Sequence, residues 1–191
     1  MMAPEAAAAA TPSIDRVLTR IAFRPEVLAA LRRGVGRPLE ESPESWPYVM
    51  EVAGNSRWRE EAAHVTLGLF ALHHQSQQPG TMNRPGQGLG TACARLKHHR
   101  GTTGGSEEGV ERRFRAALAA ETPEALAAHL RGLVTLLRGA VIPLDYPSLY
   151  RDLNRWQRPG ERERVCLAWA RQYFRTSDDD ASHDESKETD S

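Results

Sequence analysis

Apolar residues recur every three or four positions through most of the sequence, and this period limits the fold more than any other feature. Strict apolar–polar alternation, the pattern of a half-buried strand, does not persist anywhere. The stretch 122–139 is the clearest helix, because Thr122 offers a capping hydroxyl, Pro123 suits the first helical position and Gly139 ends it. Its core stripe consists of Leu126, Leu130, Leu133, Val134 and Leu137. The sequence therefore predicts an all-α, compact bundle of about seven to eight helices.

The same pattern places the remaining helices and their inward faces. Helix starts are expected near Ser13, Pro25, Ser42, Asn55 or Ser56, Leu89, Asp145 and Glu161, and a further helix carries the repeat Val110, Phe114 and Leu118. In the helix after Ser56 the apolar positions begin with Trp58, which is therefore expected to face the core. Cys93 and Cys166 are far apart and both fall on apolar helical faces. We expect them to be small core residues in a reducing compartment rather than a disulfide.

The formal net charge of zero averages two unlike parts. Residues 178–191 carry seven acids and one lysine, whereas 24 basic and 17 acidic residues remain in 13–177. We expect a disordered leader over 1–12, a basic folded domain over 13–177, and an acidic disordered tail over 178–191 that could screen weak contacts. A basic domain suits a polyanion. Arginine outnumbers lysine 23 to 2, as GC-rich coding also produces, so the placement of the arginines matters more than their number.

Membrane and secretory features are lacking. A membrane-spanning helix takes about 20 apolar residues, and no such run occurs. The N-terminal residues lack the basic and apolar regions of a signal peptide. We therefore expect a cytoplasmic protein with no membrane partner.

The stretch NRPGQGLGTACARLKHHR, residues 83–100, combines glycines, a cysteine and a histidine pair. It departs from the Walker pattern, since Thr91 follows Gly90 directly without a lysine, and no strand precedes it as a dinucleotide fingerprint requires. We expect a mobile connector over 84–88 and a helix from Leu89. Free backbone amides at that helix start are candidates for holding a nucleic-acid phosphate.

Catalytic and metal-binding arrangements are not evident. The histidines occur as adjacent pairs, His73-His74 and His98-His99, which point about 100° apart on a helix and cannot chelate together as i, i+4 pairs do. Serines and threonines occupy cap or loop positions, and paired acids fall at helix starts or in a polar loop. We expect no metal, no cofactor and no enzymatic activity.

The arginines follow regular spacings instead. Arg131, Thr135 and Arg138 recur at i, i+4, i+7 off the leucine stripe, and Arg151, Arg155 and Arg158 repeat this spacing. Such stripes can follow a phosphate backbone, although a solvated helix face is the alternative reading. The candidate nucleic-acid-binding residues are Arg32, Arg33, Arg57, Arg112, Arg113, Arg131, Arg138, Arg151, Arg155 and Arg162. Exposed aromatic residues are expected to be sparse, so contact with the backbone rather than stacking on bases is predicted.

Four stretches occur in a characteristic order: ERRF at 111–114, HLRGLV at 129–134, PLDYPSLYRDLNRW at 143–156 and the RER of the last helix at 162–164. With these stretches the order of segments resembles the CasB family, the small subunit of the type I-E CRISPR Cascade complex. The resemblance covers about residues 14–176. It implies a non-catalytic, all-helical subunit present in two copies, with a basic face that includes Arg33, Arg57, Arg112, Arg113 and Arg131, and less firmly Arg151 and Arg162.

The resemblance also implies partners. These are the crRNA-binding backbone subunit and the large subunit of Cascade, a second copy of the chain, the crRNA, and the target and displaced DNA strands of an R-loop. Two alternatives stay open at this point. One is a free-standing helical DNA-binding regulatory protein, and the other is a histidine-dependent metal enzyme that uses His73 and His98.

Overall fold

A computed structural model describes residues 13–54 and 56–188, with side chains described as far as residue 176. Over these residues the chain forms nine α-helices, two short 3-10 helices and no strand. The helices are α1 (Ile14–Ile21), α2 (Pro25–Arg33), η1 (Leu39–Glu41), η2 (Pro43–Ser45), α3 (Trp46–Ala53), α4 (Arg57–His73), α5 (Leu89–Thr102), α6 (Glu107–Leu118), α7 (Pro123–Gly139), α8 (Tyr146–Trp156) and α9 (Arg162–Glu188).

The all-α prediction is confirmed, but the helices number nine within the described part rather than seven or eight. The two short N-terminal helices begin where the sequence places them, with Ser13 capping α1 and Pro25 in the first position of α2. The expected leader over 1–12 lies outside the described residues.

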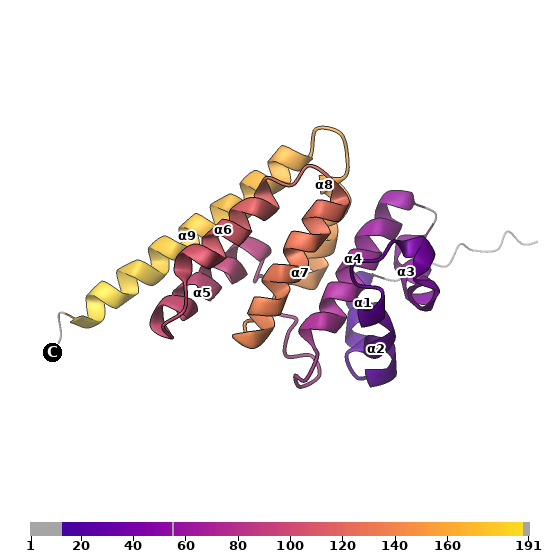
Figure 1. The fold of residues 1–191 in the computed structure, drawn as a ribbon, viewed down its shortest axis with the longest axis horizontal. Coiled ribbons are helices and arrows are strands. Elements are labelled where there is room, and N and C mark those ends of the chain that lie inside the picture. The colour runs from indigo at the N-terminus through magenta and orange to yellow at the C-terminus, as the bar shows by residue number, and fades with distance from the viewer. Residues whose placement is uncertain (1–12, 55, 189–191) are drawn as a thin grey trace, which may run out of the picture.

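The helices form two groups joined by a central pair (Figure 1). Helices α1 to α3 gather around α4 on one side, and α5, α6 and the long α9 pack together on the other. Between them, α7 contacts both α4 and α6, and α8 contacts both α4 and α9. The buried side chains of both groups form one continuous hydrophobic core. This arrangement leaves α4 and α7 side by side near the middle of the molecule.

Glycines in the stretch 83–100 serve helix packing. A Cβ at Gly90 would lie 2.0 Å from the carbonyl oxygen of Trp169, and one at Gly88 would lie 2.5 Å from Oε1 of Gln172. The backbones of α5 and α9 can therefore approach closely only because these residues carry no side chain.

The expectation of free amides at this helix start does not hold for Gly90. The amide of Gly90 donates to Gln172 Oε1 over 3.2 Å, and that of Gly86 donates to Asp145 Oδ2 over 2.8 Å. Further bonds fix the preceding connector, because Arg84 N donates to Leu144 O and Asp145 N donates to Gln87 O. The amide of Gly90 and the connector before the helix are therefore engaged by the chain itself.

Two side-chain placements differ from the sequence prediction. Trp58 is 48% exposed, because it lies in the first turn of α4, one turn before the buried stretch begins at Ala62. Exposed aromatic residues are therefore less sparse than expected, since Trp46 and Phe174 are also exposed. Cys93 is buried as expected, whereas Cys166 is only partly buried.

The C-terminal helix also runs further than expected. The backbone of α9 continues as helix to Glu188, past the boundary predicted at residue 177. No proline or glycine occurs between Arg162 and Glu188, so nothing in the sequence interrupts the backbone hydrogen bonds. A disordered acidic tail was predicted over 178–191, whereas the backbone of this segment is helical as far as Glu188. Within the described residues, no helix combines the length and apolar character needed to cross a bilayer.

The histidine pair at the end of α4 is buried against the first turn of α8. His73 Nδ1 lies 2.9 Å from the hydroxyl of Tyr146, which also donates to Leu69 O over 3.2 Å. His74 Nδ1 lies 3.0 Å from Phe70 O. Burial lowers the pKa of both imidazoles, and that of His73 falls from 6.5 to about 3. Both histidines are neutral packing residues, and His73 joins α4 to α8.

We expect the free energy of unfolding to fall as the pH drops below 6.5, since the unfolded chain then binds a proton at His73 that the folded chain excludes down to a pH of about 3. The dependence from this group approaches at most about 1.4 kcal/mol per pH unit. Urea unfolding between pH 7 and pH 4 should show a shallower loss in His73→Asn, which keeps a polar group near Tyr146 but does not titrate. Parallel curves for the two proteins would contradict this account.

Candidate nucleic-acid interface

Arg131 occupies the centre of a hollowed surface between α4 and α7. It lies on the exposed side of α7, opposite the loop that connects α2 to η1. A Cβ at Gly36, where φ is +82°, would fall 2.6 Å from Arg131 Nη1. The guanidinium therefore lies directly against the backbone of that loop. Two hollows adjoin here and share Val35, Ala128 and Arg131.

The first hollow, which we call the outer groove, is shallow and basic. Its charged lining residues are Arg32 from α2, Arg113 from α6 and Arg131 from α7, and no acidic residue lines it. Thr135 adds a hydroxyl, and the remaining lining is Val35, Leu72, Ala128, Gly132 and Leu136. Three guanidiniums from three helices over an apolar floor form a surface suited to phosphate oxygens.

Local hydrogen bonds orient two of these arginines. Arg113 Nη1 donates to Gly109 O over 3.0 Å, and Arg32 Nη1 donates to Ala71 O over 3.5 Å. Each bond uses one N–H of a guanidinium that has five, so most donors stay available to a ligand. The side chains are held in place without being neutralised.

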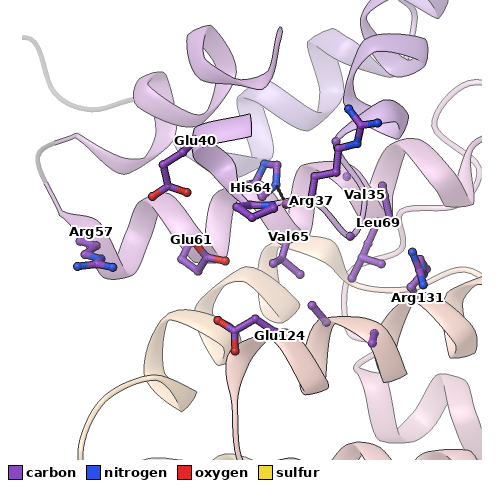
Figure 2. Close-up of a pocket in the computed structure, with 16 residues that line it drawn as sticks. Val35, Arg37, Glu40, Arg57, Glu61, His64, Val65, Leu69, Glu124 and Arg131 are labelled. Carbon is purple, nitrogen blue, oxygen red and sulfur yellow. Dashed lines mark hydrogen bonds between the residues drawn. The ribbon is translucent and has the colours of Figure 1, made fainter. Parts of the chain in front are cut away.

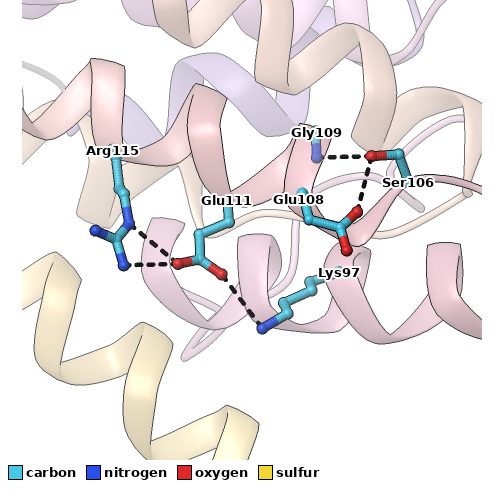
Figure 3. A network of polar contacts seen from close by, with 6 residues as sticks. All are labelled: Lys97, Ser106, Glu108, Gly109, Glu111 and Arg115. Carbon is cyan, nitrogen blue, oxygen red and sulfur yellow. Dashed lines mark hydrogen bonds and ion pairs between the residues drawn. The ribbon is translucent and has the colours of Figure 1, made fainter.

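The start of α6 is itself fixed by a polar network (Figure 3). Ser106 caps the helix by accepting from Gly109 N over 2.9 Å. One turn further, Glu111 pairs with Arg115 on its own helix at 2.7 Å and with Lys97 of α5 at 3.4 Å. Arg115 is the main cause of the lowered pKa of Glu111. Of the arginines around Phe114, Arg115 is thus paired within the chain, whereas Arg113 faces the outer groove.

The second hollow, which we call the inner pocket, has a volume of about 390 Å³. It lies between the 34–38 loop, η1, α4 and α7, and Figure 2 shows three carboxylates toward one end and Arg131 toward the other. Its charged lining residues are Arg37, Arg57, Arg131, Glu40, Glu61 and Glu124. Unlike the outer groove, this pocket offers hydrogen-bond donors and acceptors in similar number.

The structure brings together four of the ten predicted arginines, namely Arg32, Arg57, Arg113 and Arg131, around these two hollows. The other six have different surroundings. Four of them contact another side chain of the chain: Arg33 with Glu44 at 3.9 Å, Arg138 with Gln75 at 2.7 Å, Arg155 with Glu161 at 2.8 Å and Arg162 with Glu163 at 3.2 Å. The last two, Arg112 and Arg151, are exposed on α6 and α8 and line neither hollow.

Sequence reasoning missed Arg37 and the three glutamates of the inner pocket. Arg37 lies in the loop between α2 and η1, where no helical period predicts its direction. The glycines at 34 and 36 were the available signal, since a close turn beside Arg32 and Arg33 brings the next arginine back toward the same surface.

The described residues contain no group of three or more His, Cys, Asp or Glu placed to hold a metal ion. Burial raises the pKa of the Cys93 thiol, which disfavours the thiolate that a nucleophile requires. Among the described residues, the two arginine-lined hollows therefore remain as the candidate site.

Comparison with known proteins agrees with this architecture. The family described as CRISPR-associated protein Cse2 (CRISPR_cse2) matches residues 27–174. Among solved structures, CasB from Thermobifida fusca is 33% identical, with a TM-score of 0.66 and coverage of 83% of this chain and 94% of that one. CasB from M. ruber is 28% identical, with a TM-score of 0.66 and coverage of 87% and 95%. A search of curated proteins gave no match.

A chain from a structure described as a CRISPR RNA-guided surveillance complex, pre-nicking, is also similar. It is 25% identical, with a TM-score of 0.71 and coverage of 89% of this chain and 94% of that one. Taken with the fold, these matches define the class as CRISPR-associated proteins. The chain belongs to the Cse2 family, which confirms the resemblance to CasB found in the sequence.

Proposed function

We propose that this chain is the non-catalytic small subunit of a type I-E Cascade complex and that it stabilises an R-loop by binding nucleic-acid backbone in the outer groove. The observation that carries the proposal is the convergence of Arg32, Arg113 and Arg131 on one hollow without an acidic residue. Membership in the Cse2 family and likeness to a chain of a surveillance complex support the assembly. The proposed partners are the Cascade subunits, a second copy of the chain, crRNA and the target and displaced DNA strands.

Small binding energies suffice for this role. Formation of an R-loop exchanges a DNA duplex for an RNA–DNA hybrid of similar stability, so a few protein–backbone contacts tip the balance. Each guanidinium that binds a phosphate releases counterions, which makes the contact independent of sequence and sensitive to salt. A groove holding a displaced strand would thus oppose reannealing without any chemical step.

Fluorescence anisotropy with labelled single-stranded DNA, single-stranded RNA and duplex, at several salt concentrations, tests the groove. Three or four phosphate contacts predict a slope of log K against log salt of about −2 to −3 for a single strand. An affinity that does not change with salt concentration, or no binding at low salt, would contradict the proposal that the outer groove binds phosphates. A preference for one duplex sequence would favour the regulatory protein instead. A chain lacking residues 178–191 serves as the comparison for the acidic segment, and co-purification with the other Cascade subunits tests the assembly separately.

A further inference from the structure

The inner pocket holds charged groups that phosphate contacts in the outer groove do not use. Glu40 comes from η1, Glu61 from α4 and Glu124 from the first turn of α7, and Figure 2 shows the three carboxylates near one another. Among the described residues, none of the three has an ion-pair partner. The pocket therefore presents acceptors that its own structure leaves unused.

Glu40 and Glu124 are exposed at the rim of the pocket, whereas Glu61 is partly buried, so leaving its carboxylate without a partner is costly. Desolvation, together with the charges of Glu40 and Glu124, raises the pKa of Glu61. His64 also lines the pocket and is only 6% exposed. Its Nε2 lies 2.9 Å from Arg37 O, while Nδ1 is buried without a hydrogen-bond partner. A ligand that donates a hydrogen bond to Glu61 would satisfy a partly buried acceptor that is otherwise without a partner.

The lining limits what this ligand can be. With three arginines and three glutamates in the lining, neither a phosphate nor an ammonium or guanidinium meets an excess of opposite charge. No metal-binding group of His, Cys, Asp or Glu exists among the described residues. A neutral, flat molecule with adjacent donors and acceptors can donate to the glutamates and accept from the arginines. Val65 and Leu69 supply apolar surface for its faces. The volume of about 390 Å³ also lies within the range of small-molecule sites.

We propose that the inner pocket receives one unpaired base of the strand whose phosphates lie in the outer groove, and that it prefers bases with an exocyclic amino group over thymine. The amino group of such a base would donate to a glutamate, as cytosine does in protein–DNA contacts, while an arginine would donate to a ring nitrogen or carbonyl. Because Arg131 lines both hollows, a phosphate bound there places the attached nucleotide at the pocket entrance. This inference rests on the proposed function.

The test compares oligo(dC) with oligo(dT) of equal length, bound to the full chain at one low salt concentration and pH 7.5. We expect oligo(dC) to bind about fivefold more tightly, the lower end of the discrimination given by a good polar pair to a base. The double variant Glu61→Ala/Glu124→Ala removes the acceptors and should bring this ratio close to one. The matched control, Glu60→Ala/Glu121→Ala, removes the same charge from the same two regions outside the pocket and should keep the ratio. Using the ratio cancels the general gain in affinity that loss of negative charge produces.

The possible outcomes distinguish failure of the base-pocket proposal from failure of the outer-groove proposal. Salt-dependent binding with equal affinity for both strands, or a ratio unchanged in the pocket variant, would overturn the base pocket and leave the groove standing. If neither strand binds, titration with free deoxycytidine and thymidine still tests the pocket through the amide NMR signals of residues 61–69 and 124–131. Shifts with deoxycytidine support it, and shifts with neither nucleoside overturn it. Shifts caused only by an arginine-containing peptide would show that a partner protein occupies the pocket instead.

Discussion

Replacing Arg131 by glutamate is expected to weaken binding of single-stranded DNA about tenfold or more, because hydrogen bonds to a charged group contribute about 1.5–3 kcal/mol and the reversal adds repulsion. Arg131 is the residue that both hollows share, so its reversal affects the outer groove and the inner pocket together. Its side chain is exposed and lies outside the leucine stripe, so the fold should remain intact. Anisotropy measures the affinity, and circular dichroism confirms the helical content.

Two further variants make this result specific. Arg113→Glu should cause a similar loss, since Arg113 lines the same outer groove. Arg175→Glu is the matched control, because Arg175 is exposed on α9 and lines neither hollow. In an assembled complex the two groove variants should also reduce R-loop stability. If all three variants bind single-stranded DNA as tightly as the unaltered chain, the binding surface lies on another face of the protein.

The second large effect concerns stability. Gly90→Ala is expected to lower the free energy of unfolding by about 3 kcal/mol or more, because its Cβ would overlap the carbonyl oxygen of Trp169 at 2.0 Å, and backbone atoms cannot turn aside as a side chain does. Either α9 moves away from α5 or the first turn of α5 unwinds. Urea unfolding followed by circular dichroism measures the change.

Gly132→Ala provides the opposite expectation. Gly132 lies inside α7, and a Cβ there would meet no atom within 4 Å. Since alanine is favoured over glycine in a helix by about 1 kcal/mol, this variant should be as stable as the original or more so. Equal destabilisation by the two substitutions would show that the close approach of α5 and α9 does not explain the role of Gly90.

Local signals in the sequence predicted the helices well and the surface only in part. Thr122 and Ser13 cap their helices as expected, because capping depends on neighbours three residues away. The direction of Trp58 was not predictable, since periodicity cannot show where neighbouring helices stop covering α4. Arg155 belongs to a regular stripe, yet Glu161 pairs with it through a turn that the spacing does not reveal.

The candidate site, too, was predictable from the sequence only in part. Arg32, Arg113 and Arg131 were identified singly, but only the packing of α2, α6 and α7 shows that they face one hollow. The inner pocket was not foreseen at all, because Glu40, Glu61 and Glu124 each suit an ordinary helix start and become unusual only when brought together.

The pairing of α5 with α9 has a consequence for synthesis on the ribosome. Helix α5 is complete by residue 102, but the helix that covers Gly88 and Gly90 begins only at Arg162. The chain is synthesised from its N-terminus, so the apolar face of α5 around Leu89 and Cys93 stays uncovered until about sixty more residues have been added. At typical elongation rates this takes about 3–12 s. A nascent chain arrested before α9 would leave that face uncovered, so premature termination yields an aggregation-prone product rather than a shorter functional one.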